Sequence, residues 1–182
     1  MNLRERGITL KELAGLKAEE VEKLLKSVGF RRAKAERLVG LARAIERIGG
    51  LEGLKSKGPE YVRRFLRSIK GIGEETADAI TLFALNLPTI PISKYVRTVL
   101  SRLGLEGSDE QLRKLIMEQL RSLRELKLFY AGVTSVGKVA CKKEPKCGLC
   151  PLRGVCRFAL TRSRVLSGDE NCCPSRTGRK AY

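Results

Sequence analysis

The sequence predicts an all-α protein with two helical lobes, and three observations support this fold class. Apolar residues recur at helical spacing through most of the chain, and no segment shows the convincing alternation of a strand. A glycine pair separates two amphipathic helices near the middle, and four cysteines gather close to the C-terminal end. The length of 182 residues is ample for one domain, or for two small lobes that share a core.

Helix periodicity and end signals define the expected elements. In chain order they are a short apolar turn at 10–16, then helices at 18–28, 31–48, 61–68, 74–85, 94–103, 109–123 and 125–139. Gly29 and the pair Gly49-Gly50 end helices, and a glycine-rich loop is expected at 51–59. Ser108, followed by Gln111 three residues later, predicts a capping box at the start of the helix at 109.

The segment Gly71-Ile72-Gly73 joins two of these helices and is the first candidate for a binding site. We expect both glycines to adopt backbone angles closed to other residues. The amides of residues 72–75 could then approach a phosphate at the start of the following helix. Such contacts position a nucleic acid without reading its sequence. The alternative is a tight turn in a helical bundle, but the strongly basic chain favours the phosphate-binding role.

The charge of the chain points to a polyanionic partner. Thirty-seven Lys and Arg face 20 Asp and Glu, which gives a net charge of +17. Nucleic acid is the commonest such partner, and a merely solvated basic surface is the alternative. Trp and His are absent, which argues against extensive stacking on single strands and removes the usual base at neutral pH.

The sequence contains no apolar run long enough to span a membrane and no secretory signal at its start. We therefore expect an intracellular protein, in the cytoplasm or nucleoid, with no membrane partner, and we expect a monomer. Low Asn and Gln with abundant Lys, Arg and Glu is typical of thermophilic sources.

The cysteines provide the strongest chemical signal. Cys141, Cys147, Cys150 and Cys156 lie within sixteen residues, with one C-x-x-C flanked by two longer arms. Four thiolates without His suit tetrahedral zinc or a cubane iron–sulfur cluster. In an intracellular protein, metal ligation is favoured over disulfides. The adjacent Cys172-Cys173 is interpreted as a pair of incidental thiols.

Several motifs together carry a family resemblance. They are Gly71-Ile72-Gly73-x-x-Thr76-Ala77-Asp78, Pro88-Thr89-Ile90, Lys94-Tyr95, Arg102-Leu103-Gly104 and the four cysteines. Over residues 10–156 the chain resembles the helix-hairpin-helix DNA glycosylases of the endonuclease III superfamily, most closely the branch that removes methylated purines. The cysteine spacing resembles the 4Fe–4S loop of that superfamily, whose first arm is commonly one residue longer. The resemblance thus favours the cluster, with zinc as the alternative.

The resemblance also implies a domain division. Residues 1–92 would form a helical barrel lobe with the helix-hairpin-helix at 61–85. Residues 93–156 would form the second helical lobe, with the cluster loop at 141–156, and 157–182 a mobile basic tail. The first lobe is expected to be incomplete at its N-terminus, because the family has a further helix or two before the segment matching 10–30.

Double-stranded DNA is the partner that the resemblance implies. The expected DNA-binding residues are Lys70, Gly71, Ile72, Gly73, Thr76, Lys94, Lys142, Lys143, Lys146 and Arg153. The hairpin supplies the first five, and charges held on the cysteine loop supply the last four.

Two departures from the family concern catalysis. Ser93 stands at the position of the family's catalytic aspartate, and Glu75 stands where strand-cleaving members carry a lysine. A serine hydroxyl can neither carry negative charge at neutral pH nor serve as a general base, although serine is a strong N-cap for the helix beginning at Lys94. Lys94 is a candidate nucleophile in a dry pocket, or else a phosphate contact.

Two functions therefore remain open. One is a glycosylase of base excision repair that removes a damaged, alkylated base from duplex DNA without cutting the strand. The alternative is a catalytically degenerate duplex-DNA-binding protein that keeps the hairpin and the cysteine loop.

The cysteine motif makes a prediction about metal content. Protein purified without oxygen should be brown and contain about four irons per chain by elemental analysis. Cys150→Ala should lose both the colour and the solubility. A colourless, folded protein with one zinc would contradict the cluster assignment.

Overall fold

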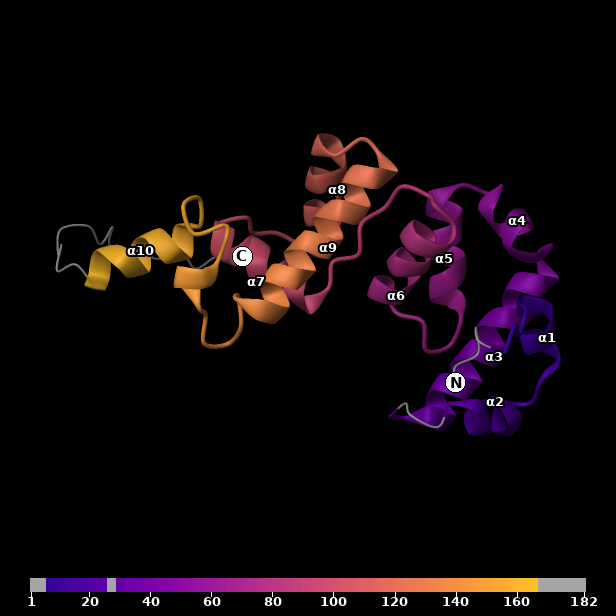
Figure 1. The fold of residues 1–182 in the computed structure, drawn as a ribbon. Coiled ribbons are helices and arrows are strands. Elements are labelled where there is room, and N and C mark those ends of the chain that lie inside the picture. Colours follow the sequence, from indigo (N-terminus) through magenta and orange to yellow (C-terminus); the bar gives the residue numbers. More distant parts are fainter. Residues whose placement is uncertain (1–5, 26–28, 167–182) are drawn as a thin grey trace, which may run out of the picture. The chain divides into compact units, whose positions relative to one another are not determined.

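The computed structural model describes residues 6–25 and 29–166, and this part of the chain is helical, without a strand (Figure 1). The all-α fold class is confirmed. The elements are α1 (Leu10–Gly15), α2 (Ala18–Leu24), α3 (Arg31–Arg47), α4 (Gly50–Lys55), α5 (Pro59–Ser68), α6 (Glu74–Ala79), the π-helical turn η1 (Ile80–Ala84), α7 (Lys94–Leu103), α8 (Asp109–Gln119), α9 (Leu123–Val139), the 3₁₀ turn η2 (Cys147–Leu149) and α10 (Arg157–Leu166). None of the described helices has both the length and the apolar character needed to cross a membrane.

Most expected helices are present, and α7 begins and ends as predicted. The capping box at Ser108 and Gln111 is confirmed, with reciprocal hydrogen bonds of 2.8 and 3.2 Å. Three expectations were wrong. Helix α8 ends at Gln119 rather than at 123, and α9 begins at Leu123. Helix α2 ends at Leu24 rather than at 28, although residues 26–28 lie outside the described part. The loop expected at 51–59 contains the short helix α4, which forms because Leu54 is fully buried on one side of it.

Two further capping boxes begin α1 and lead into α9, and both involve glutamates whose pKa is lowered. Backbone and side-chain hydrogen bonds from Thr9 lower the pKa of Glu12. The Ser122 hydroxyl, at 2.8 Å, and then its backbone N–H lower the pKa of Glu125. A lowered pKa means that each carboxylate stabilises its helix above the pKa of the unfolded chain. That contribution disappears as the pH falls through the folded-state pKa.

Contacts divide the chain into two units. Unit 1 comprises Met1–Ile92 and Arg113–Tyr130, and unit 2 comprises Ser93–Leu112 and Ala131–Tyr182. The segment 113–130 therefore packs with the first unit, whereas the division expected from the sequence placed it in the second lobe. The reason is side-chain contact within unit 1: Arg113 pairs with Asp78, and the Tyr130 ring lies 5.5 Å from that of Phe83.

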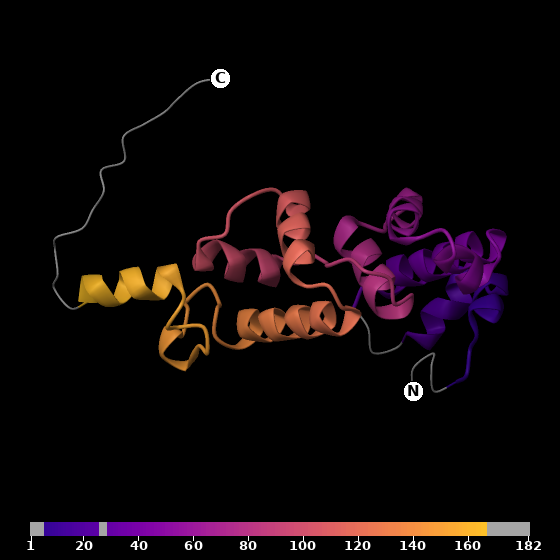
Figure 2. The ribbon, with the colours of Figure 1, turned by 90° about the horizontal axis from the view of Figure 1, so that it is seen from above.

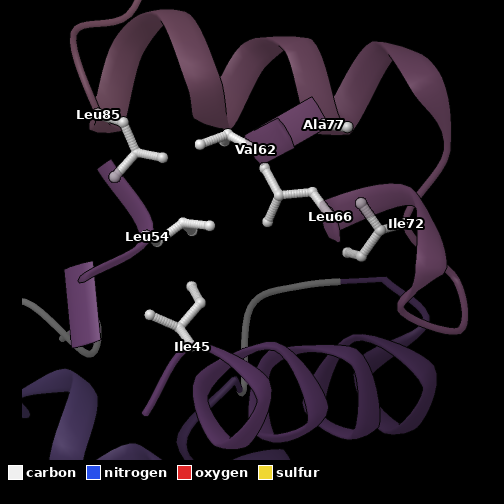
Figure 3. Close-up of a cluster of buried hydrophobic side chains, with 7 residues drawn as sticks. All are labelled: Ile45, Leu54, Val62, Leu66, Ile72, Ala77 and Leu85. Atoms are coloured by element: carbon white, nitrogen blue, oxygen red, sulfur yellow. The ribbon is translucent and has the colours of Figure 1, made fainter. Parts of the chain in front are cut away.

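The core of unit 1 lies between α3, α4, α5 and α6. Figure 3 shows its buried side chains converging, namely Ile45, Leu54, Val62, Leu66, Ile72, Ala77 and Leu85. Burying one leucine of this kind contributes roughly 1.5–3 kcal/mol relative to leaving it exposed. Ile72 belongs to the hairpin itself, so the same core that joins the helices also holds the turn between α5 and α6 in place.

A buried ionic network lies beside this core. The Asp78 carboxylate is 1% exposed and accepts hydrogen bonds from Arg63 Nε at 2.5 Å and Arg113 Nη2 at 2.7 Å. The Thr89 hydroxyl lies 3.3 Å from the same carboxylate. Both arginines are buried, and Arg63 also reaches Glu60 at 3.2 Å. The network therefore joins α5, α6, α8 and the proline turn.

The predicted mobile tail needs a correction over its first ten residues. Arg157–Leu166 forms α10, which follows the cysteine loop in unit 2 (Figure 2). Ala159 is buried, and the Phe158 ring lies under the Arg102 guanidinium, 5.1 Å from its Cζ. These contacts give the segment an apolar side that its arginines concealed in the sequence. The rest of the predicted tail, including Cys172 and Cys173, lies outside the described residues.

Removal of the buried carboxylate should be strongly destabilising. Asp78→Ala leaves two buried guanidinium groups without their anion, and breaking such a pair typically costs about 3–5 kcal/mol of unfolding free energy. Urea denaturation followed by circular dichroism measures this loss. Glu36→Ala is the matched control, because it removes the exposed Arg32–Glu36 pair and should cost at most about 1 kcal/mol. Similar losses in the two variants would contradict a structural role for the network.

Candidate nucleic-acid interface

The helix-hairpin-helix is formed by α5, the turn Ile69–Gly73 and α6. Ala77 N–H donates to the Gly73 carbonyl at 2.9 Å, which begins α6, and no side chain caps this helix. The first-turn amides of any helix lack intrahelical acceptors. The chain therefore presents donors at Glu74–Thr76, together with the positive end of the helix dipole. Thr76 and Glu75 are exposed on this turn, as is Lys70 before it.

Two details of the hairpin differ from the sequence prediction. Gly71 has a φ of +86°, as expected, but Gly73 has φ −85° and ψ 176°, an ordinary extended conformation. The left-handed residue alone is sufficient to reverse the chain here. The Ile72 N–H donates to the Ile69 carbonyl at 3.0 Å, and its side chain is buried in the core. Ile72 therefore anchors the turn rather than offering its amide to a ligand.

A second constraint acts on Gly71. A Cβ at this position would lie 2.6 Å from Arg37 Nε and 2.9 Å from its Cγ, so the Arg37 side chain extends over the glycine. Arg37 and Lys34 of α3 line a pocket of about 370 Å³ together with Gly71 and Thr76. Sequence reasoning missed these two cations, because α3 and the hairpin are distant in the chain.

Phe30 is a further surface feature that sequence reasoning missed. It precedes α3 with a φ of 55° and is 89% exposed, followed by the exposed Arg31 and Arg32. A left-handed phenylalanine that is almost entirely exposed gains nothing from burial within the chain. The pair Gly29-Phe30 directly before two arginines was the available signal. Such an apolar side chain beside cations can insert between bases or stack on them.

Ser93 performs the capping role expected of it. Its Oγ accepts a hydrogen bond from Val96 N–H at 3.3 Å, and the residue is 3% exposed. Lys94, the first residue of α7, is exposed. The two candidate catalytic residues therefore lie in different environments, the hydroxyl buried and occupied, the ammonium in solvent.

The cations of unit 2 fall into two sets. Lys94, Lys142 and Lys143 line one pocket of about 490 Å³, together with Tyr95, Arg102 and Lys138 among others. Lys146 and Arg153 instead line a separate pocket of about 400 Å³ with Arg162. The structure therefore brings Lys94 of α7 together with Lys142 and Lys143 at the start of the cysteine loop. Lys146 and Arg153, the other two predicted DNA-binding residues of that loop, lie in a different pocket.

The four cysteines line a common pocket, together with Arg102, Phe158 and Ala159 among others. Arg102 Nη1 donates to Cys141 Sγ at 3.1 Å and to the Lys142 carbonyl at 2.8 Å. The donor set is therefore all sulfur and shares one site, with a cation beside one thiol. Among the residues described, no three potential ligands are drawn together closely enough to hold a metal ion as they stand.

Comparison with known proteins agrees with these features. Residues 1–125 match the family described as HhH-GPD superfamily base excision DNA repair protein. A Methanocaldococcus jannaschii protein, MJ1434, whose name gives it provisionally as a DNA repair glycosylase, is 30% identical over 145 residues, covering 76% of this chain and 66% of that protein. Endonuclease III of Thermotoga maritima is 29% identical over 164 residues, covering 86% of this chain and 71% of that protein.

Solved structures give the same result. A trapped endonuclease III–DNA covalent intermediate, an estranged-adenine complex, is similar with a TM-score of 0.67 and 25% identity, over 89% of this chain and 75% of that one. The Helicobacter pylori 3-methyladenine DNA glycosylase bound to 1,N6-ethenoadenine has a TM-score of 0.59 and 25% identity, over 75% and 74% of the two chains. The chain therefore spans about two thirds to three quarters of the length of these relatives.

The two hairpin glycines should respond differently to alanine. Gly71→Ala forces a side chain into the left-handed region, which costs about 1–2 kcal/mol of unfolding free energy, and its Cβ also meets Arg37. Gly73→Ala meets no atom within 4 Å and should change stability by no more than about 0.5 kcal/mol. Urea denaturation of both variants measures the difference. The double variant Gly71→Ala/Arg37→Ala should regain the steric part of the loss, and equal losses in the two single variants would contradict the assignment.

Proposed function

Because the chain belongs to the HhH-GPD superfamily of base excision DNA repair proteins, we propose that it binds duplex DNA and removes a damaged, alkylated base without cutting the strand. Its homologues are DNA repair glycosylases of base excision repair. The observation that carries the proposal is the hairpin, with left-handed Gly71 and an uncapped helix start on a chain of charge +17. A duplex-DNA substrate also agrees with the expected location in the cytoplasm or nucleoid, and we retain the expectation of a monomer.

The hairpin is suited to a backbone phosphate. The amides of Glu74 and Glu75 point out of the first turn, and Thr76 can add its hydroxyl. The negative charges of Glu74 and Glu75 on the same turn would repel a phosphate. The charge of Glu74 is offset by its ion pair with Arg67 at 2.9 Å. Lys70 on the turn, and Lys34 and Arg37 from α3, supply the compensating positive charge. Each exposed ion pair between one of these cations and a phosphate contributes at most about 1 kcal/mol to binding. The affinity for DNA therefore depends on how many such pairs form.

Insertion of Phe30 into the duplex would complement these backbone contacts. Extruding a base costs a few kcal/mol of lost stacking and pairing. An apolar side chain that is already exposed can fill the space left in the stack, with Arg31 and Arg32 beside it for the flanking phosphates. Phe30 is thus the residue we assign to duplex distortion.

Position 75 supports base removal without strand cleavage. In this chain the residue is an exposed glutamate on the second position of α6. A carboxylate cannot form the Schiff base through which a lysine cuts the sugar–phosphate chain. Similarity to a 3-methyladenine glycosylase bound to an ethenoadenine supports an alkylated purine as the substrate class.

Position 93 supports the second candidate function, a duplex-DNA-binding protein without catalysis. A carboxylate there would stabilise the cationic sugar and assist the attack of water, and such a group typically contributes about 10²–10⁴-fold to the rate. Ser93 cannot supply this charge, and its Oγ is occupied as a helix cap. Lys94 is exposed, so it lacks the dry surroundings that would make it a nucleophile, and a phosphate contact suits it better.

For the cysteines we propose a 4Fe–4S cluster held by Cys141, Cys147, Cys150 and Cys156, with zinc as the alternative. Their shared pocket and all-sulfur donor set support it. When bound, the cluster would supply structural ligation that orders the loop. Arg102 serves the same end, because it binds the Cys141 sulfur and the Lys142 carbonyl and so fixes the base of the loop against α7.

A comparison of three residues at position 93 tests the catalytic proposal. Duplexes carrying single alkylated bases should be incubated with the protein, and free base and abasic sites measured. Ser93→Asp keeps the helix cap and restores the carboxylate, so base release should rise by about 10²-fold or more without strand cleavage. Ser93→Asn is the matched control, since it caps equally well but carries no charge, and it should stay at the parental rate.

Two outcomes decide between the candidate functions. Rapid base release by the unmodified protein would show that position 93 is not a lost catalytic site. A Ser93→Asp variant that binds DNA normally but is inert on every lesion would favour the non-catalytic DNA-binding protein. Lys94→Ala should weaken binding without abolishing release, and abolition would instead identify Lys94 as the nucleophile.

A further inference from the structure

The groove of unit 2 that contains Lys94, Lys142 and Lys143 has an unusual charge distribution. Lys138 joins these three lysines in lining it, and none of the lining residues is an aspartate or a glutamate. None of the four lysines forms an ion pair with a carboxylate of the described residues. Like charges gathered in one concave surface repel one another and raise the local concentration of anions. An anionic ligand is therefore the natural occupant.

Lys138 is held in this groove by an aromatic ring. Its Nζ lies 5.7 Å from the centroid of the Tyr95 ring, within the range of a cation–π interaction. Lys138 comes from the last turn of α9, and Tyr95 from the first turn of α7. The ring therefore orients an ammonium that four single bonds would otherwise leave free to move.

Gly137 makes this arrangement possible. A Cβ at Gly137 would lie 2.7 Å from Tyr95 Cβ and 3.0 Å from its Cδ1. Only glycine allows α9 to approach the Tyr95 ring so closely. Helix α9 continues through Gly137 to Val139, so the glycine does not interrupt it.

Lys94, Lys142 and Lys143 already belong to the expected duplex-DNA surface; we propose that Lys138 is a further phosphate contact in this groove, and that Tyr95 is the positioning residue for Lys138. The inference rests on the proposed binding of duplex DNA and adds these two residues to it. It also separates the loop cations: Lys142 and Lys143 bind the backbone in the groove, whereas Lys146, which lines a different pocket, does not.

Salt dependence of binding is the measurement. Anisotropy titrations of a short, fluorescent duplex between 50 and 200 mM salt give the slope of log affinity against log salt, about −0.9 per phosphate contacted. Lys138→Ala should reduce the magnitude of the slope by about 0.9, so that its affinity falls about 3.5-fold less than that of the parent over this range. Lesion-free and lesion-containing duplexes should give the same change, because the contact is to the backbone.

Matched variants isolate each part of the proposal. Lys146→Ala removes an equal charge from the same loop and should keep the parental slope. Tyr95→Leu should reproduce the slope of Lys138→Ala, whereas Tyr95→Phe, which keeps the aromatic face, should bind as the parent. Circular dichroism of each variant verifies that it is folded.

The outcomes separate this inference from the proposed function. If the unmodified protein lacks salt-dependent duplex binding, the proposed function fails and the groove proposal fails with it. If the parent binds with a steep slope but Lys138→Ala keeps that slope, as Lys146→Ala does, the groove proposal alone is overturned. A normal slope for Tyr95→Leu beside a reduced slope for Lys138→Ala would overturn the role assigned to Tyr95.

Discussion

The hydrogen-bonded pairing of Asp78 with Arg63 and Arg113 determines how the helices of unit 1 meet. Removing three charged groups from water is costly, and the pairing repays that cost only in a geometry that satisfies the carboxylate from both sides. Hydrophobic packing tolerates small shifts of the helices. A carboxylate that accepts hydrogen bonds from two arginines does not, because hydrogen bonds weaken steeply away from their preferred distance and angle. Helices α5 and α6 are therefore joined twice, once by the leucine-rich core and once by this network.

The hairpin inherits its rigidity from that double connection. Its two flanking helices are fixed, its central side chain Ile72 is buried, and Gly71 completes the reversal in the left-handed conformation. For the proposed phosphate contact, donors held on such a frame would need no ordering, which conserves binding free energy. The groove of unit 2 also contains a pre-oriented cation, but by another means. Close packing at Gly137 places the Tyr95 ring, and this ring orients the flexible Lys138 side chain.

Periodicity predicted most of the helices because burial of one face is a local property of the sequence. The buried ionic network could not be predicted from periodicity. Arg63 follows Val62 directly, and nothing in the spacing shows that its guanidinium turns inward to meet a carboxylate fifteen residues away. The groove could not be predicted for a similar reason, since Lys94 and Lys138 line it together only because α9 approaches α7 at Gly137. By contrast, Ser93 could be interpreted correctly as a cap, because capping depends on neighbours in the chain.

That cap has an evolutionary consequence. Serine and aspartate both satisfy the first amides of a helix, so exchange between them at position 93 keeps the cap of α7. Selection for the cap therefore does not distinguish the two residues, whereas the proposed catalytic chemistry does. Under the proposed function, a lineage could exchange the catalytic carboxylate for a hydroxyl and later regain it while keeping this helix cap. Under the proposed function, position 93 would therefore let activity change while the start of α7 stays capped.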